Sequence, residues 1–417
     1  MHPQAKQRLR ELVLGAVDGL EVGSHDLNTS GTHSVLPPLT KFVEENCGEW
    51  VDPFFAFVDV LVSVENAVKS VGLLTQPGPM RNVISDEQRQ LIANRVAEFW
   101  DTVPKSYEFI FPLPAFPLFN ADIELAPGIK LKNVPQSTVD DTSMGIGVPL
   151  NTLAGVPQPL MASLAVTGQG LMLFANAADP AAASAIRRAK TVLQLGEVED
   201  AFALTATKFR PPHHISHVPA ASSEAVVLPV ALAGALARLM VKQTDTQPQV
   251  SLKERLRTVG LVLAREVQWD PTRKRPTWGS AEAAHAQVNR HCARIATAAE
   301  WLFDATHEQP SATTFVQTAI GFEALYGGSK GEPVIETLAN RVAYSLGTSP
   351  QGREQTARAF SDFYETRSAV VHSGATRLTR EQQRQLANAQ ITLKLALRHE
   401  MRLAGQGDSE MATPGGA

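Results

Sequence analysis

The sequence has few cysteines and no strong excess of charge of either sign. Its 417 residues include only two cysteines, Cys47 and Cys292, which cannot form a disulfide framework and fit a reducing compartment. The formal net charge of −4 gives the whole chain no attraction to nucleic acid or to anionic membranes. Any contact with nucleic acid must therefore come from a local group of basic residues.

Long hydrophobic runs and targeting segments are absent as well. The most apolar runs, residues 51–64 and 225–240, are too short or too interrupted to span a bilayer. No N-terminal segment combines the basic and apolar parts of a signal peptide. We therefore expect a cytoplasmic protein with no membrane partner.

Motifs for common cofactors and nucleophiles are also missing. The sequence contains no Walker loop, no dinucleotide-binding glycine fingerprint and no Gly-x-Ser-x-Gly elbow. His213 and His217 are four residues apart, but the preceding prolines at 211 and 212 argue against a helix that would align them. Because no nearby cysteine or acidic pair completes a ligand set, we expect neither a metal nor a cofactor.

The chain does contain enough apolar material for a folded protein. Its hydrophobic content of 44% and charged content of 19% are typical of soluble globular proteins, and its length allows two or three domains. We expect an α+β fold that is mainly α. Its regions, in order, are an N-terminal helical region (1–103), a mixed α/β region (104–223), a helical connector (224–304), a C-terminal helical bundle (305–404) and a disordered tail (405–417).

Hydrophobic periodicity supports this division. Apolar residues recur at helical spacing toward both ends of the chain and follow extended patterns in the middle. Helices are expected at 4–20, 52–74, 85–101, 181–195, 225–242, 251–266, 280–303, 311–326, 333–346, 352–372 and 379–403, with a loop at 21–40. One or two strands with a turn at 168–170 are expected within 160–176. A further strand is expected at 201–208, and a hairpin around Pro127-Gly128 at 123–131.

An arginine interrupts the apolar face of the helix expected at 352–372. The residues of this face recur at spacings of three, four and seven: Ala357, Phe360, Phe363, Tyr364, Val370 and Val371. Arg367 falls in the middle of the face. A guanidinium cannot lose its charge and is costly to bury without a partner. We therefore expect Arg367 to meet a carboxylate, a second subunit or an anionic ligand.

Two further charges lie on or beside apolar helix faces. Glu323 follows Val316, Ala319 and Ile320 on one such face, and Arg341 lies beside another. One interpretation is a structural Glu–Arg pair that fixes the register of neighbouring helices. The other is that these charges support a functional site around Arg367.

Three segments of the last quarter resemble a known family. Residues 322–326 (FEALY), 338–343 (LANRVA) and 363–374 (FYETRSAVVHSG) are similar to the HEPN superfamily (higher eukaryotes and prokaryotes nucleotide-binding), and most of all to its ApeA-like branch. The resemblance covers about residues 305–404 and implies a dimerising helical bundle behind a large N-terminal region. It also implies an activity, since many such proteins are metal-independent ribonucleases of phage defence or toxin systems.

The resemblance assigns individual residues. Arg367 and His372 match the family's Arg-x4–6-His positions, which two copies bring into one composite site across the dimer. The position after the arginine is often Asn, Asp or His in the family, and here it is Ser368. Some members bind nucleotide or RNA without cleaving it. The departure at Ser368 therefore leaves a catalytic and a non-catalytic protein open.

The residue types suit RNA cleavage through the 2′-hydroxyl. Histidine side chains can take or give a proton near neutral pH, which suits His372 to proton transfer. The planar guanidinium of Arg367 matches the oxygens of a phosphate. Five residues of α-helix turn through about 140°, so one subunit need not aim both side chains at one phosphate. The alternative for His372 is a residue that caps the helix C-terminus.

The best local basic patch lies farther upstream. Arg273, Lys274 and Arg275 stand between Trp269 and Trp278, and basic residues interleaved with aromatics are what single-stranded nucleic acid binds. A solvated loop is the alternative, because Lys and Arg are mostly exposed in any protein.

Together these observations predict a homodimeric HEPN-type endoribonuclease that uses no metal and acts in phage defence or a toxin-like system. Residues 1–304 would then bind a trigger or regulator or serve as an assembly platform. The alternative is a non-catalytic HEPN-like module that binds RNA, nucleotide or a protein partner, in which Arg367 and Glu323 are structural.

Overall fold

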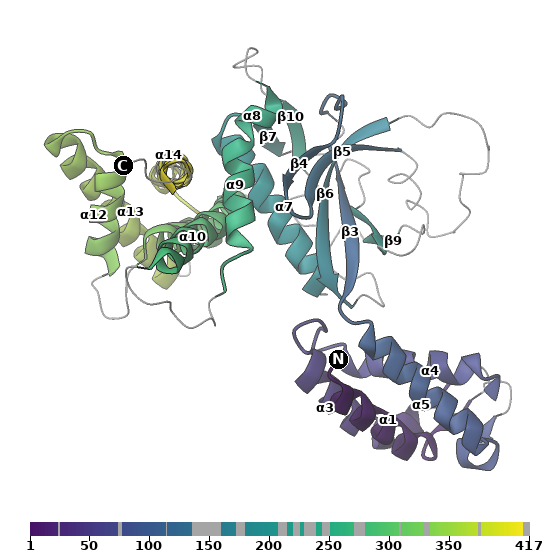
Figure 1. Ribbon diagram of the computed structural model, residues 1–417. Helices are drawn as coiled ribbons and strands as arrows, with labels where there is room; N and C mark the ends of the chain where they lie inside the picture. Colours follow the sequence, from purple (N-terminus) through teal and green to yellow (C-terminus); the bar gives the residue numbers. More distant parts are fainter. Residues whose placement is uncertain are drawn as a thin grey trace. The chain divides into compact units, whose positions relative to one another are not determined.

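The chain forms two compact units, each described here by itself (Figure 1). The first comprises residues 1–109, 167–185 and 217–232, and the second comprises 110–166, 186–216 and 233–417. The computed structural model describes residues 1–23, 26–73, 77–113, 115–135, 160–171, 180–206, 215–219, 226–228, 239–243, 251–270, 280–307, 310–327, 334–373 and 377–411. These residues build an α+β fold that is mainly α, as predicted.

The first unit begins with helices that pack on one another. They are α1 (Pro3–Val17), α2 (Thr29–Val35), α3 (Pro37–Cys47), α4 (Ala56–Ser70) and α5 (Asp86–Asp101), and a short 3-10 turn, η2, covers Met80–Asn82. Strand β1 (Glu21–Val22) pairs antiparallel with β2 (Gly78–Pro79). The loop predicted at 21–40 is therefore wrong, because α2 and the start of α3 occupy most of it. Two prolines in the first turn of α3 start a helix there rather than prevent one.

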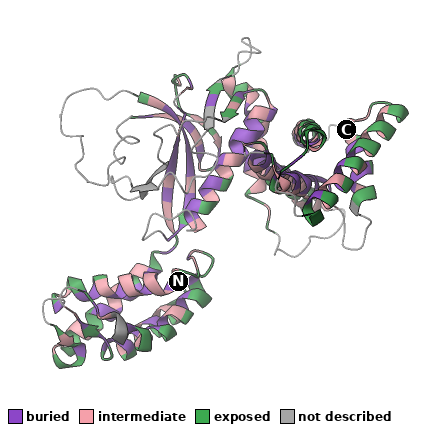
Figure 2. Ribbon diagram, turned by 180° about the vertical axis from the view of Figure 1, so that it is seen from behind, coloured by how far each residue is buried: buried purple, intermediate pink, exposed green. Residues whose placement is uncertain are grey.

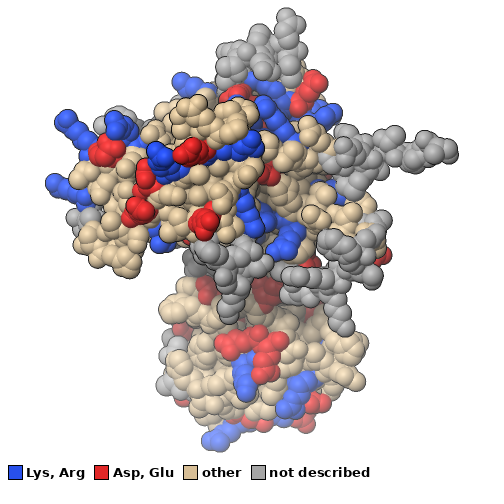
Figure 3. Space-filling view, turned by 90° about the vertical axis from the view of Figure 1, so that its left-hand side faces the viewer, with Lys and Arg blue, Asp and Glu red and all other residues tan. Residues whose placement is uncertain are grey.

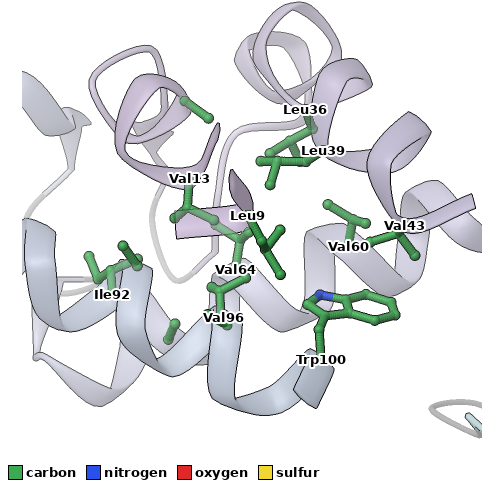
Figure 4. Close-up of a cluster of buried hydrophobic side chains, with 14 of the residues drawn as sticks. Leu9, Val13, Leu36, Leu39, Val43, Val60, Val64, Ile92, Val96 and Trp100 are labelled. Atoms are coloured by element: carbon green, nitrogen blue, oxygen red, sulfur yellow. The ribbon is translucent and has the colours of Figure 1, made fainter. Parts of the chain in front are cut away.

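The core of these helices is almost entirely aliphatic (Figure 4). Leu9 and Val13 of α1, Val64 of α4 and Val96 of α5 are at most 1% exposed, as the apolar periodicity predicts. Trp100 closes one end of the core, where its indole Nε1 donates a 3.1 Å hydrogen bond to Ser63 Oγ. The serine thus satisfies the one polar atom that the buried tryptophan brings.

A six-stranded sheet has the order β4-β5-β6-β3-β8-β9. Its strands are β3 (Lys105–Pro112), β4 (Ile123–Ala126), β5 (Ile129–Pro135), β6 (Leu160–Gly170), β8 (Ile215–Pro219) and β9 (Val226–Leu228). Strands β4 and β5 form the predicted hairpin, with Gly128 at a φ of 73° that favours glycine. The turn predicted at 168–170 is wrong, because β6 continues to Gly170; residues 172–176 lie outside the described residues.

The helix predicted at 225–242 is wrong where the structure describes this segment. Val226–Leu228 is β9, and β10 (Leu239–Gln243) pairs antiparallel with β7 (Phe202–Ala206). Apolar composition alone does not separate a buried strand from a buried helix, and here the ladder with β7 decides. The expected connector at 224–304 consequently begins with strands.

The remaining helices are long and belong mainly to the second unit. They are α7 (Pro180–Val198), α8 (Leu252–Arg255), α9 (Arg257–Glu266), α10 (Ala281–His307), α11 (Ala312–Tyr326), α12 (Val334–Leu346), α13 (Pro350–Ser373) and α14 (Arg380–Met411). Helix α10 runs without a break through the boundary predicted at residue 305. Helix α14 extends to Met411, so a disordered tail that starts at 405 is wrong for residues 405–411.

Helices α10 to α14 pack as a bundle. Most of the buried residues of α10 lie in its C-terminal half, whereas α12 and α13 each keep an exposed face (Figure 2). Phe315 of α11 stacks on Phe363 of α13 with ring centroids 5.5 Å apart, and Phe322 meets Phe360 edge-on at 4.9 Å. A Cβ at Gly321 would lie 2.6 Å from a Leu393 methyl, so glycine permits the close approach of α11 and α14.

The second half of α7 packs on the same bundle. Lys190 Nζ lies 2.7 Å from Asp304 Oδ1 of α10, and both side chains are about one-fifth exposed. At the end of α7, Arg398 Nε of α14 donates a 2.7 Å hydrogen bond to the Val198 carbonyl oxygen. The bundle thus includes residues that the sequence analysis assigned to the mixed α/β region.

Candidate functional site

Helix α13 holds the residues of the predicted site. It begins with Pro350, whose missing N–H costs nothing in the first turn, and it buries Phe360 and Phe363 against α11. Tyr364 and Arg367 are three residues apart and therefore neighbours on the helix surface. The aromatic packing fixes this surface relative to α11, where Glu323 lies.

Arg367 keeps its charge without a protein counter-ion in the described part of the chain. Its side chain is half-buried, and the guanidinium carbon lies 5.8 Å from the centroid of the Tyr364 ring. No ion pair to a described carboxylate falls within 4.0 Å, and the buried Nε atom has no hydrogen-bond acceptor among the described residues. The described residues thus offer Arg367 no carboxylate partner, and the other two predicted partners, an anionic ligand and a second subunit, stay predictions.

The Glu323 carboxylate has a partner on α13. The Tyr364 hydroxyl donates a hydrogen bond to Glu323 Oε1. Burial raises the pKa of the Tyr364 hydroxyl above its usual value, and the bonded Glu323 carboxylate raises it further. The hydroxyl therefore stays protonated and remains a donor near neutral pH. A direct Glu323–Arg367 pair, one form of the structural interpretation, is absent from these described residues.

Arg341 caps the C-terminus of α11. Its Nη1 atom donates a hydrogen bond to the Tyr326 carbonyl oxygen at the C-terminus of α11. Arg294 of α10 does the same from another side, through Nε to the Ala324 carbonyl oxygen at 3.0 Å and Nη2 to the Gly327 carbonyl oxygen at 2.7 Å. The sequence analysis missed Arg294, because nothing in its local pattern indicates which distant helix end it caps.

His372 lies in the last turn of α13, and its side chain is exposed. It makes no hydrogen bond to a described carbonyl group, but its place in the last turn agrees with the alternative in which it interacts with the helix dipole. Ser368 is half-buried on the same helix. Within one chain, Arg367 and His372 are separated by about 7.5 Å along the helix axis and about 140° around it. The chain does not bring the two side chains to one point.

The predicted basic patch is only partly described. Trp269 is half-buried, and the Arg290 guanidinium lies 5.9 Å from its ring centroid. Arg273, Lys274 and Arg275 lie outside the described residues, as do the side chains of His213 and His217. Arg290 was not predicted. It lies on the helix that follows the patch and adds a described basic group beside Trp269.

A second polar cluster lies elsewhere in the bundle. His291 Nε2 of α10 approaches Glu400 Oε2 of α14 to 3.2 Å, and Ser345 of α12 donates a 3.2 Å hydrogen bond to Glu400 Oε1. Burial and the Glu400 carboxylate raise the pKa of Tyr326 above its usual range. Glu400 is only 7% exposed, yet the sequence analysis placed no polar partner there.

Basic and acidic side chains are interspersed on the face of the C-terminal helices that Figure 3 shows. The described residues of this face therefore form no continuous basic patch of the kind that binds nucleic acid. Within the described ranges, no group of three or more His, Cys, Asp or Glu side chains is arranged to hold a metal ion. Among the helices that are described, none has both the length and the apolar content to cross a membrane.

Comparison with protein-family models, with curated proteins and with solved structures finds no match for this chain. The resemblance to HEPN proteins therefore remains an expectation from the sequence. The functional argument rests on the geometry of α13 and its neighbours.

Proposed function

We propose that this protein is a cytoplasmic, metal-independent endoribonuclease of HEPN type that acts as a homodimer, in phage defence or a toxin-like system. The observation that carries the proposal is the state of Arg367. This cation is half-buried, is not ion-paired within the described residues and lies on the same helix as the exposed His372. An unpaired guanidinium beside a packed core is costly unless a ligand neutralises it.

In the proposed reaction, a phosphate of RNA takes the place of the missing counter-ion. Arg367 binds the phosphate oxygens and stabilises the charge that builds up during attack by the neighbouring 2′-hydroxyl. The 2′-oxygen bonds to phosphorus as the bond to the 5′-oxygen breaks, which leaves a 2′,3′-cyclic phosphate and a 5′-hydroxyl. His372 takes the proton of the 2′-hydroxyl or gives one to the departing 5′-oxygen. Because the two side chains diverge on one helix, Arg367 of one copy works with His372 of the other across a two-fold axis. Residues 1–304 would bind the trigger or regulator.

The first test is RNA cleavage by purified full-length protein in the presence of EDTA. Arg367→Ala and His372→Ala should each abolish cleavage while the circular-dichroism spectrum and the dimer stay unchanged. Arg358→Ala is the matched control, because Arg358 is an exposed arginine of the same helix that pairs with the exposed Glu354 at 3.1 Å. Cleavage by both site variants at the wild-type rate would overturn the proposal.

A mixing experiment tests the composite site. Arg367→Ala and His372→Ala proteins, each inactive alone, should regain cleavage when they are mixed and exchange subunits, because the mixed dimer holds one intact Arg367 and one intact His372 on opposite chains. If mass spectrometry shows mixed dimers that remain inactive, the two residues do not act in trans.

The alternative function is RNA, nucleotide or protein binding without cleavage, and the departure at Ser368 favours it. In that case the wild type binds RNA but leaves it intact, and Arg367→Ala weakens binding. Electrophoretic mobility shifts on the same proteins separate the two functions.

A further inference from the structure

Glu323 and Arg367 carry opposite charges next to the same tyrosine and yet do not pair. Tyr364 donates its hydroxyl to Glu323, while its ring lies against the Arg367 guanidinium. The buried Arg367 Nε–H lacks an acceptor among the described residues. When a carboxylate and a guanidinium meet, they can form a bidentate pair, which is among the strongest hydrogen-bonded contacts of side chains. Here each of the two groups contacts the same tyrosine instead.

We propose that the Tyr364 hydroxyl is a guard: by occupying the Glu323 carboxylate, it prevents that carboxylate from neutralising Arg367 and keeps the guanidinium available for a phosphate. Tyr364 is thus a positioning residue that acts through Glu323. This inference rests on the proposed function for its biological meaning, although the guard itself concerns only three side chains of one chain.

The chemistry of the contact supports the guard. A carboxylate accepts a charge-assisted hydrogen bond from a hydroxyl, and a partly buried carboxylate that loses such a donor seeks another. The elevated pKa of Tyr364 keeps the proton on the hydroxyl, so the donor is present throughout the neutral range. Tyr364 and Arg367 are three residues apart on one helix and in contact, so we take Arg367 as the replacement donor for Glu323.

The test is Tyr364→Phe, which keeps the ring beneath Arg367 and removes only the hydroxyl. Glu323 should then pair with Arg367, and RNA cleavage should fall by about 10- to 100-fold, the effect of one hydrogen bond to a charged group. The double variant Tyr364→Phe/Glu323→Gln should recover most of the lost activity, because a neutral amide cannot neutralise the guanidinium. A merely structural role for the hydroxyl predicts no such recovery.

A second readout does not depend on cleavage. Phenylglyoxal modifies free guanidinium groups, and peptide mass spectrometry reports the rate at Arg367 alone. The rate should fall several-fold in Tyr364→Phe and return in the double variant. Failure of the wild type to cleave RNA while these rates change as expected would reject the nuclease but keep the guard. Equal rates at Arg367 in the wild type and in Tyr364→Phe would overturn the guard.

Two controls complete the design. Tyr344→Phe is the matched control, because Tyr344 of α12 is 71% exposed and its ring lies 5.0 Å from the Arg353 guanidinium. It should change neither the cleavage nor the rate at Arg367. If Tyr364→Phe does not fold, the rate is measured in Glu323→Ala. An unchanged rate there supports the guard, whereas a several-fold rise would show that Glu323 already neutralises Arg367 in the wild type and would overturn it.

Discussion

His291 of α10 and Glu400 of α14 are joined by a 3.2 Å contact between Nε2 and Oε2 inside the helical bundle. Ser345 of α12 bonds the other carboxylate oxygen, so one glutamate connects three helices. Burial by itself would raise the pKa of Glu400. The hydrogen bond from His291 and the nearby Tyr326 hydroxyl outweigh that effect, so that the pKa lies below its usual value.

The first prediction concerns acid stability. Because the pKa of Glu400 is lower in the folded state, its contribution is fully present above the unfolded value of 4.5 and is lost as the pH falls through the folded value. Thermal denaturation across pH 3 to 7 should therefore show a fall in Tm at acid pH that is shallower in Glu400→Gln than in the wild type. Parallel curves for the two proteins would contradict this assignment.

Removing the Glu400 carboxylate altogether should cost more. In Glu400→Ala the half-buried partners His291 and Ser345 lose their acceptor, which should lower the free energy of unfolding by roughly 1–3 kcal/mol at neutral pH. Urea denaturation measures this change. Glu381→Ala is the control, because Glu381 is an exposed residue of the same helix that pairs with the exposed Arg384, and it should change stability by less than about 0.5 kcal/mol.

The second prediction concerns the end of α11. Arg294 spans two carbonyl groups there with the fork of its guanidinium, and lysine cannot reproduce that geometry. Arg294→Lys should destabilise the protein by about 1–2 kcal/mol in urea denaturation, although the charge is kept. Arg384→Lys, at an exposed position, should have no measurable effect. Equal stability of Arg294→Lys and the wild type would show that charge alone caps the helix.

The third prediction compares two glycines in helices. A Cβ at Gly260 of α9 would lie 2.4 Å from the Leu125 carbonyl oxygen of β4, so Gly260→Ala forces helix and strand apart and should cost about 1–3 kcal/mol. Gly15 of α1 has nothing within 4 Å of such a Cβ, and Gly15→Ala should stabilise by about 0.5–1 kcal/mol. Chemical denaturation of both variants checks the opposite signs, and the same sign for both would refute the packing argument.

The fourth prediction separates a functional Arg367 from a structural one. Because Arg367 forms no ion pair with a described carboxylate, Arg367→Met should keep the packing of the apolar stem and change the free energy of unfolding by no more than about 1 kcal/mol, the scale of the lost contact with the Tyr364 ring. Differential scanning calorimetry measures the effect. A loss of several kcal/mol would favour the structural alternative.

Much of the helical architecture follows from local chemistry that the sequence displays. Ser85 and Ser311 cap α5 and α11 through their hydroxyl groups, and the apolar spacing of Leu9 and Val13 places them in a core. Gly128 permits the turn between β4 and β5. The same periodicity made Arg367 conspicuous, since a charge in an apolar stripe is visible without any structure.

Other elements depended on partners far away in the sequence. The composition of segment 239–243 does not distinguish a helix from a strand. The segment forms β10 because it pairs with β7 through a ladder of hydrogen bonds. In the sequence Arg294 is an ordinary basic residue of α10. Its capping role depends on the packing of α10 against the end of α11. His291 and Glu400 carry no common motif and meet only because α10 packs on α14.

For the candidate site, the sequence by itself determined that a permanent cation would lie on a packed helix face with a titratable imidazole five residues later, because side-chain chemistry and helical spacing are local properties. Only the tertiary structure decided what surrounds that cation. Helix packing places Glu323 against the Tyr364 hydroxyl instead of against Arg367, and such a choice between two donors depends on distances that no one-dimensional pattern contains.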